Sequence, residues 1–393
     1  MNSWGRVSTK TISAAMPGIV NIRDVHDTTG PDVQTARIVV VVGAREVVAE
    51  VLHRSGALSL AIRLRRWTPL QQVRIVSYHH VADPEPAYPY DPDVADATSA
   101  QFRRQMETLS SFGTTITTDD LVRAFAGEPL PRNPVMVTFD DGYRSCHDTA
   151  MPILRSLGMR ATFFVATAFT SQRRLYWWEK VALALSQARR SQGTISYPEV
   201  TTVKARDPAT RVWANNTIKN HPLLDVDRFV DGLFAALDVP WSPAIEREHA
   251  ERLIMTWDHV RALAAAGMDI ESHTRTHRVL RTLASDQLHA ELAGSRADIE
   301  EQIDKPIYGV AYPVGRSIAN HPQLIEAVKT AGYKIGFTNT NRPNWVWPHA
   351  LAGLLPMKMY DVGRLPTDRE ITDSMWLARL LIPRLAHGAL HPE

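Results

Sequence analysis

The sequence predicts a parallel α/β fold, and three of its features lead to this expectation. Apolar, strand-like runs alternate with helix-like segments along most of the chain, as in sheets whose parallel strands are joined by helices. The runs that end near Phe139 and Ser272 each lead into a cluster of polar residues. The chain has 393 residues, of which 44% are hydrophobic and 22% are charged, so it can bury one large core or two small ones.

The alternation can be followed element by element. Strands are expected where short runs of β-branched and aromatic residues lie between turn signals; they cover residues 73–80, 135–139, 161–165, 268–273, 307–312, 333–338 and 351–357. Helices are expected where apolar residues recur at helical spacing; they cover residues 98–112, 121–126, 146–157, 256–266, 285–303, 322–331 and 371–386. Thr256 and Ser285 are expected to cap the starts of two helices, and Gly158 and Gly267 follow the ends of two.

Two segments fall outside this alternation. Residues 1–70 contain a valine-rich strand at 38–42 and an Arg-rich stretch at 51–67, and we expect them to form an N-terminal extension. Residues 171–252 carry helical patterns without strand alternation, and we interpret them as a helical insertion that shapes a substrate cleft. The expected organisation is the extension at 1–70, an α/β domain at 71–360 that contains the insertion, and a helical tail at 361–393.

Composition narrows the class of protein. The formal net charge of +2 gives no reason to expect a nucleic-acid partner. The single cysteine, Cys146, excludes an internal disulfide, and we expect a buried apolar role for it. No apolar segment is long enough for a transmembrane helix, and residues 1–20 lack the apolar core of a secretory signal, so a cytoplasmic location is expected. Peripheral membrane contact through the Arg-rich stretch is the alternative to a solvated helix face, which we favour.

The first candidate site lies at the end of the expected strand at 135–139. Asp140 and Asp141 follow that strand directly and precede Gly142. Two adjacent carboxylates repel each other, and they are costly to bury unless they are paired or bind a cation. Asp-Gly is also a common turn signal, so this motif by itself indicates a turn and a catalytic site equally.

A pair of histidines follows the expected strand at 268–273. His273 and His277 are four residues apart, so they converge on one point if the segment is helical or tightly turned. The C-terminal ends of parallel barrel strands share one face, which would place Asp141 beside both histidines. Two histidines and a carboxylate suit Zn²⁺ and leave a position open for water. Asp140 would then take the proton from this water, and the result is hydrolysis of an amide or an ester.

Two further groups complete the expected chemistry. The N–H of Val314, within the segment 312–315, is a candidate donor to the oxyanion, although this segment is nearly as typical of a simple turn. The leaving group needs an acid, and His79 and His80 end the expected first strand. Successive strand residues point to opposite sides, so at most one of them faces the site. We assign His79, with a structural histidine as the alternative.

In these motifs the chain resembles the polysaccharide deacetylases of the NodB-homology type, carbohydrate esterase family four. The resemblance covers about residues 73–358, and it rests on the segments 138–142, 273–277, 312–315, 77–79, 177–178 and 255–258 and on Gly267. It implies a deformed (β/α)7 barrel. It also implies the following roles: general base, Asp140; metal ligands, Asp141, His273 and His277; oxyanion donor, the N–H of Val314.

The chain departs from the family pattern at two places. Many members have Arg-x-Pro-Tyr-Gly in the third motif, where this chain has Ala311 and Val314, and the missing arginine normally orients the base. The Leu-x-His motif that supplies the acid in many members is not found, since His387 lies beyond the expected barrel. A subset that acts on poly-N-acetylglucosamine carries a Tyr-His pair at the first strand, where the histidine is the acid, and Tyr78 with His79 is similar to that pair.

The resulting expectation is a metal-dependent hydrolase, most simply with Zn²⁺, that removes acetyl groups from N-acetylated sugars of a polysaccharide or glycolipid. Tyr312, Trp177 and Trp178 are expected to contact this substrate, because aromatic rings stack on sugars; a core role explains the two tryptophans, and Trp257, equally well. Two alternatives remain open. One is an O-acetyl esterase or cyclic-amide hydrolase on the same scaffold, and the other is a non-catalytic carbohydrate-binding protein, which would have no need of a base beside a metal.

Overall fold

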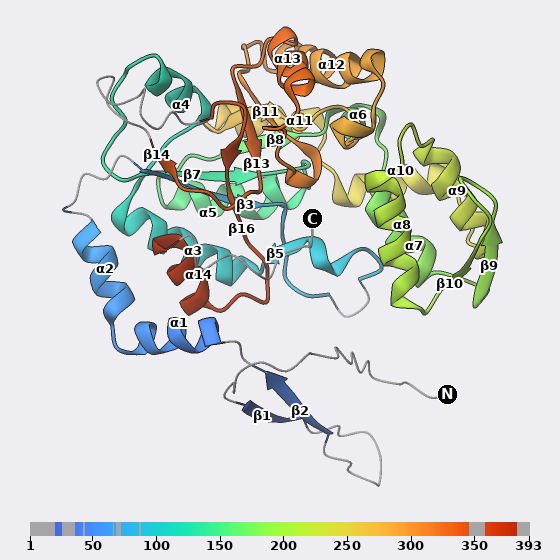
Figure 1. The fold of residues 1–393 in the computed structure, drawn as a ribbon, viewed down its shortest axis with the longest axis horizontal. Coiled ribbons are helices and arrows are strands. Elements are labelled where there is room, and N and C mark those ends of the chain that lie inside the picture. The colour runs from blue at the N-terminus through green and yellow to red at the C-terminus, as the bar shows by residue number, and fades with distance from the viewer. Residues whose placement is uncertain are drawn as a thin grey trace.

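The computed structural model describes residues 20–25, 36–41, 44–65, 67, 72–85, 88–345 and 358–382. The expected strand at 351–357, the end of the expected tail helix and His387 lie outside these residues. Figure 1 shows a central sheet with helices around it and a further group of helices to one side of the barrel. That group is the insertion, and it lies beside the elements that carry the candidate site.

The centre of the fold is a sheet that is nearly closed into a barrel. Its strands, in spatial order, are β14 (Asn344–Trp345), β3 (Gln72–Tyr78), β7 (Pro134–Phe139), β8 (Thr162–Val165), β11 (Asp269–Ser272), β12 (Gly309–Ala311), β13 (Ile335–Thr338) and β15 (Val362–Gly363). Neighbouring strands are parallel except β14 and β3. One residue after β15, the strand β16 (Leu365–Pro366) pairs in parallel with β3. The chain therefore crosses between the two ends of the sheet here, and the expected deformed barrel is confirmed.

Helices cover the outside of this barrel (Figure 1). They are α3 (Ser99–Phe112), α4 (Thr118–Phe125), α5 (Met151–Ser156), α6 (Thr167–Gln172), α11 (Trp257–Ala265), α12 (Ser285–Ile303), α13 (Pro322–Thr330) and α14 (Asp373–Leu381). Apolar side chains of these helices and of the outer strand faces form one large buried cluster. This burial is the main favourable contribution to folding, and it fixes which side chains of each strand face the barrel interior.

The barrel interior holds a second, smaller apolar cluster. Its strand residues are Val73, Ile75, Met136, Phe164, Ala311, Ile335, Phe337 and Val362. Side chains alternate between the two faces of a strand, so these residues define the inward positions of β3, β7, β8, β12, β13 and β15. The polar side chains that continue this alternation beyond the strand ends are therefore directed into one mouth of the barrel.

Most expected elements lie where the sequence places them, and the differences have local causes. Thr256 caps α11, as expected, since its side chain accepts the N–H of His259. Ser285, in contrast, is the first helical residue of α12 and not its cap; Ala284 holds the cap position, and the Gln287 side chain accepts its N–H. Helix α4 begins at Thr118, three residues before the expected start, because Thr117 and Asp120 form a capping box.

The insertion contains strands as well as helices. Its elements are α7 (Trp177–Ser186), β9 (Gln192–Ile195), β10 (Thr201–Lys204), α8 (Pro208–Asn220), α9 (Val226–Ala236) and α10 (Pro243–Leu253). The strands β9 and β10 pair in antiparallel fashion, so the expectation of helices alone was wrong for residues 192–204. Partly or fully exposed threonines and one glycine in this hairpin give little periodicity from which a strand could be predicted.

The N-terminal region also differs from the expectation. The strands β1 (Val20–Val25) and β2 (Ala36–Val41) pair in antiparallel fashion, and two helices, α1 (Ala44–Arg54) and α2 (Ala57–Arg65), replace the single expected Arg-rich helix. They are separated at Gly56, whose φ of 77° is easily adopted only without a side chain. Among the helices that the structure describes, none combines the length and the hydropathy of a transmembrane span.

Candidate active site

Polar side chains from several strand ends meet at one mouth of the barrel. Counting in steps of two from the inward positions of β3, β7 and β15 leads to His79, Asp140 and Arg364. Residues 273–277 follow β11 at the same end of the sheet, because β3, β7, β11 and β15 all run in the same direction. The site is therefore built from segments that are far apart in the sequence and adjacent only in the folded barrel.

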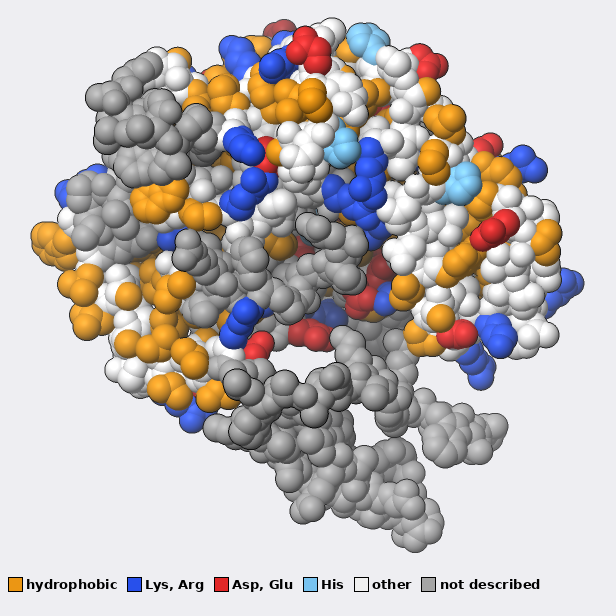
Figure 2. All heavy atoms as spheres, viewed as in Figure 1, with side chains coloured by type: hydrophobic (Ala, Val, Ile, Leu, Met, Phe, Trp, Pro, Cys, Tyr) orange, Lys and Arg blue, Asp and Glu red, His pale blue; other side chains and the backbone are white. Residues whose placement is uncertain are grey.

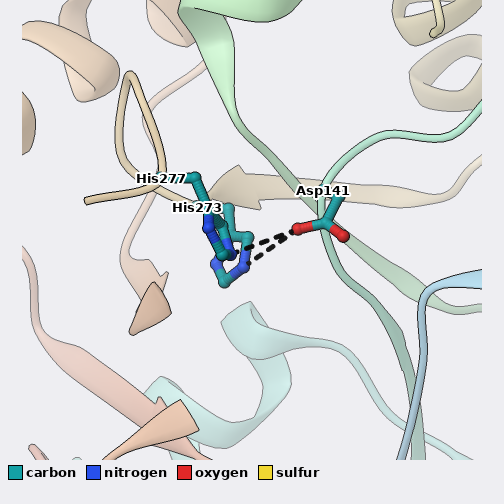
Figure 3. Close-up of side chains that lie close together, drawn as sticks. All are labelled: Asp141, His273 and His277. Atoms are coloured by element: carbon teal, nitrogen blue, oxygen red, sulfur yellow. Dashed lines mark ion pairs between the residues drawn. The ribbon is translucent and has the colours of Figure 1, made fainter. Parts of the chain in front are cut away.

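Asp141, His273 and His277 come together as a buried group (Figure 3). The Oδ1 atom of Asp141 lies 3.3 Å from Nε2 of His273 and 3.4 Å from Nε2 of His277. Three ligand atoms thus converge on one point, as Figure 3 shows. The histidine segment is a turn and not a helix, and Asp141 and His277 both have positive φ, of 71° and 54°. Such backbone is strained for residues other than glycine, and it is concentrated at functional sites.

The donor set fits a divalent metal ion. Ligands about 2.0–2.1 Å from a tetrahedral Zn²⁺ are about 3.3 Å from each other, close to the two distances found here. The Nδ1–H of His273 donates to the carbonyl oxygen of Ala311 at 2.8 Å, which leaves the lone pair of Nε2 directed at Asp141. Burial lowers the pKa of His277 to about 3, so this ring is neutral. Neutral imidazole is the form that binds metal.

The two tryptophans expected to bind sugar are buried beside the histidines. Trp178 packs edge-on against the His277 ring with a centroid distance of 4.6 Å and stacks on Tyr176, and its indole N–H donates to the hydroxyl of Tyr143 at 2.7 Å. Trp177 lies 6.4 Å from His277 between ring centroids, and both tryptophans are nearly inaccessible to solvent. The structure therefore shows both tryptophans packed around His277 and not as an open surface on which a sugar could stack.

Asp140 lies next to the group formed by Asp141, His273 and His277. It is held by an arginine that the sequence analysis did not identify. Arg364, between β15 and β16, donates from Nη1 to Oδ1 of Asp140 at 2.6 Å and from Nη2 to Oδ2 at 2.7 Å. Both side chains are fully buried. Burial alone would raise the pKa of Asp140, but the charge of Arg364 outweighs it and holds this pKa well below its usual range. Asp140 is therefore ionised.

His79 faces the same mouth from the end of β3. Its Nε2 is 4.0 Å from Oδ2 of Asp140, and its Nδ1–H donates to Oδ2 of Asp96 at 2.9 Å. Burial lowers the pKa of His79, but the carboxylates of Asp96, Asp141 and Asp140 outweigh it and raise this pKa to about 10. The ring is therefore protonated at neutral pH, as an acid must be.

His80 points the other way. Its Nδ1 is 2.6 Å from the hydroxyl oxygen of Ser145, and burial lowers its pKa to about 4. The strand alternation that favoured His79 over His80 in the sequence agrees with these two positions.

Val314 and Tyr312 occupy the loop after β12. Val314 has φ 65° and ψ 0°, an unusual conformation for a β-branched residue. Apart from bonds within its own turn, the described part of the chain shows no backbone acceptor for the N–H of Val314. Tyr312, expected to bind substrate, is buried, and its hydroxyl donates to the carbonyl oxygen of Tyr360 at 3.0 Å. The Tyr312 hydroxyl therefore already has a hydrogen-bond partner, and it lies against Gly336 of β13.

A second histidine–carboxylate group lies on the surface. His147, Asp148 and His259 have potential ligand atoms within 4.8 Å of one another. However, Nδ1 of His259 accepts the N–H of Thr256 at the start of α11, and Arg144 donates to Asp148 at 2.8 Å. These atoms already have partners, so the group fits a metal less well than the buried one.

Two residues of the site escaped the sequence reasoning. Arg364 was missed because the last strand was expected at 351–357; the run Val-Gly-Arg-Leu-Pro at 362–366 is too short to be recognised as two strands. Asp96 was missed because it follows a proline-rich acidic loop and belongs to a three-residue strand, β5 (Ala95–Ala97). No pattern in the sequence links either of them to His79 or Asp140.

Comparisons with known proteins identify the family of the chain. A sequence model of the polysaccharide deacetylase family matches residues 127–336. This range contains Asp140, Asp141, His273, His277 and Val314, but not His79, Asp96 or Arg364. The Bacillus subtilis (strain 168) protein YxkH, whose name assigns it to the polysaccharide deacetylases, is 30% identical over 84 residues. That alignment spans 21% of this chain and 29% of YxkH.

The fold is shared with a solved structure at low sequence identity. The Streptococcus pyogenes deacetylase PplD, in complex with acetate, superposes with a TM-score of 0.51 and 16% identity, over 80% of this chain and 99% of PplD. A polysaccharide deacetylase from Bacillus cereus has a TM-score of 0.49 and 15% identity, over 79% of this chain and 69% of its own.

Proposed function

The chain belongs to the polysaccharide deacetylase family, and on this premise we propose that it is a metal-dependent hydrolase that removes acetyl groups from N-acetylated sugars of a glycan. The observation that carries the proposal is the arrangement of Asp141, His273 and His277 within ligand distance of one another, with the ionised Asp140 directly beside them. A carbohydrate-binding protein would gain nothing from a buried carboxylate paired to arginine next to such a group.

The residues that would hold the ion are Asp141, His273 and His277, and we propose Zn²⁺ because two imidazoles and one carboxylate suit it best. When bound, a divalent ion of this kind lowers the pKa of its water and polarises the acetyl carbonyl. The remaining steps belong to side chains and backbone of this chain.

Asp140 accepts the proton of the attacking water, and Arg364 keeps that carboxylate in one orientation and in its ionised form. The N–H of Val314 donates to the oxyanion that forms on the acetyl carbon. His79, protonated and held by Asp96, gives its proton to the leaving nitrogen. Base and acid therefore start in the opposite protonation states that hydrolysis of an amide requires.

An N-acetyl group is favoured over an O-acetyl group because of His79. A leaving amine must be protonated before it departs, whereas a leaving alkoxide depends less on a strong acid. The Tyr78–His79 pair also supports a likeness to the members that act on poly-N-acetylglucosamine. We retain O-acetyl esters and small cyclic amides as competing substrates for the test.

The proposal is tested by acetate release from chitooligosaccharides, acetylated xylan and a small cyclic imide, each with chelator and after addition of Zn²⁺. We expect chelator-sensitive release from chitooligosaccharides above all. Asp140→Asn is expected to abolish release, by about 10²-fold or more, while metal analysis still finds the ion. His273→Ala is the matched variant that should lose both. Substantial acetate release by Asp140→Asn would exclude this residue as the base.

A further inference from the structure

Two arginines near the mouth of the barrel share an unusual partner. Arg281 lies in the short helix η3 (Leu280–Thr282) that follows β11, and Arg316 follows the turn η4 (Pro313–Gly315) after β12. Nη2 of Arg281 and Nη1 of Arg316 both donate to Oδ1 of Asn220, each at 2.9 Å. Two positive groups thus converge on one neutral oxygen, which compensates neither charge.

No carboxylate compensates them either. Within the part of the chain that the structure describes, no Asp or Glu oxygen lies within 4.0 Å of a nitrogen of Arg281 or Arg316. Two arginines of the insertion differ in this respect, since Arg174 pairs with Asp227 and Arg211 donates to Asp91 at 2.7 Å. A guanidinium has five N–H donors, so each of the two arginines keeps donors for a further acceptor.

Arg281 and Arg316 line a pocket that is formed by the loops after β11 and β12. Its other walls include Val279, Tyr312, Pro313 and His321. Val279 is two residues from His277, and Pro313 directly precedes Val314, so the pocket is lined by the same two loops that carry His277 and Val314. Figure 2 shows Lys and Arg side chains gathered near the middle of this face, between the barrel loops and the insertion helices.

We propose that Arg281 and Arg316 form a subsite for an anionic group, a carboxylate or a phosphate, carried by the glycan next to the sugar that loses its acetyl group. This inference rests on the proposed function and narrows its substrate class to acidic glycans. Planar guanidinium groups bind carboxylate and phosphate through paired, charge-assisted hydrogen bonds. An anion that replaces or joins Asn220 satisfies two cations that otherwise repel each other.

The test is calorimetric binding in an Asp140→Asn background, which prevents turnover during the titration. Three probes are used: a hyaluronan tetrasaccharide, the neutral chitotetraose and inorganic phosphate. In hyaluronan, N-acetylglucosamine alternates with a glucuronate. We expect hyaluronan to bind about tenfold more tightly than chitotetraose at low salt, with a preference that shrinks as salt is added. Competition by inorganic phosphate distinguishes a phosphate-selective subsite from one that takes carboxylates.

The variant Arg281→Gln/Arg316→Gln is expected to lose the preference for hyaluronan and to bind chitotetraose as before. Arg155→Gln/Arg190→Gln removes the same charge from two exposed arginines elsewhere and should keep the preference. Asn220→Leu removes the shared oxygen and leaves both arginines, so it should bind hyaluronan at least as well. If the double variant lost affinity for hyaluronan and chitotetraose equally, the two arginines would have only a structural role, and the inference would be overturned. Equal affinities of the Asp140→Asn protein for the two sugars would also overturn it. Acetate release from chitooligosaccharides is measured separately, so failure of the subsite and failure of the deacetylase proposal can be distinguished.

Discussion

At the scale of single residues, the site combines strained backbone with charges that compensate one another. Asp141, His277 and Val314 all have positive φ, and each such residue costs about 1–3 kcal/mol. In the proposed function, these residues supply a ligand oxygen, a ligand nitrogen and the N–H that donates to the oxyanion. Strain of this kind persists only where the surrounding structure holds it, as the buried Trp178 does beside His277.

The first prediction concerns the Arg364–Asp140 pair. Without the guanidinium, burial raises the pKa of Asp140, so Arg364→Gln should move the acidic limb of the kcat/KM profile to higher pH and lower the maximum. The pKa of Asp140 is lower in the folded protein than in the unfolded chain, where it is near 4. This difference stabilises the folded state at pH values above about 4, and the contribution is lost as pH falls. In the variant an unpaired buried carboxylate should cost about 3–5 kcal/mol in urea unfolding at neutral pH.

Arg364→Lys is the control for this pair, because it keeps the charge and loses the two-point contact. We expect an intermediate shift of the acidic limb. An acidic limb that does not move in either variant would mean that Arg364 does not set the ionisation of Asp140.

The second prediction separates the two adjacent histidines. His79→Ala should lower kcat for an N-acetylated substrate by about 10²–10⁴-fold, whereas His80→Ala should act mainly on stability, since His80 is buried against Ser145. The measurement is acetate release by both variants at matched folded fractions. A larger loss of kcat in His80→Ala would transfer the acid role to His80.

The raised pKa of His79 also gives a stability prediction. Its folded pKa of about 10 is above the unfolded value of about 6.5, so its contribution is complete below pH 6.5 and is lost as pH rises toward 10. Comparing the free energy of unfolding of the parent and His79→Gln across this range tests the point. The decline between pH 6.5 and 10 should be weaker in His79→Gln, and parallel curves would contradict it.

At the scale of elements, helix α7 of the insertion packs against His277. Helix α7 carries Trp177 and Trp178 against His277, and Glu179 in the same helix accepts hydrogen bonds from Tyr143 at 2.5 Å and from the N–H of Asp91 at 2.7 Å. Burial raises the pKa of Glu179 to about 8. The helix is thus anchored by buried aromatic and polar contacts, and it limits the orientations open to the His277 ring.

The third prediction follows from this contact. Trp178→Ala should lose about 3–5 kcal/mol of stability and, beyond that, weaken zinc binding by about tenfold or more, because the His277 ring is no longer held. Zinc affinity is measured by competition with a chromophoric chelator under conditions where both proteins are folded. Trp213→Ala is the control, since Trp213 packs on Phe229 within the insertion. Equal zinc affinities of the two variants would limit Trp178 to a packing role.

At the scale of the whole molecule, barrel closure assembles the site. Asp140 follows β7 and Arg364 lies where the chain passes from β15 to β16, which pairs with β3. These positions are 224 residues apart in sequence, yet their side chains form a two-point contact. The orientation of Asp140 therefore depends on the connection between β15 and β16, and substitutions that distort this connection should change the site.

The fourth prediction concerns the ion and the fold together. A ligand that binds only the folded state stabilises it by about 2.7 kcal/mol at a concentration 100 times its Kd. Zinc at that excess should therefore raise Tm in thermal unfolding, and chelator should reverse the change. His273→Ala and His277→Ala should show no zinc-dependent change in Tm. A shift of the same size in these variants would place the ion elsewhere, for example at His147 and His259.

The sequence by itself determined the alternation of strands and helices, the two aspartates after β7, the two histidines after β11 and the choice of His79 over His80. Each of these rests on a short-range rule: hydrophobic periodicity, turn chemistry or the two-sided geometry of a strand. The family resemblance needed the motifs in order, and those are also local. Roles that depend on one segment could be predicted because one segment contains the whole signal.

Only the tertiary structure decided which residues hold Asp140 and His79 in place, and what the aromatic residues contact. Arg364 and Asp96 reach Asp140 and His79 because barrel closure and a short strand bring them there, and no spacing in the sequence encodes either contact. Trp177, Trp178 and Tyr312 were expected at a sugar surface, but burial against His277 and Tyr360 occupies them. Long-range packing sets these partners, since a side chain's surroundings depend on every element that the closed barrel places around it.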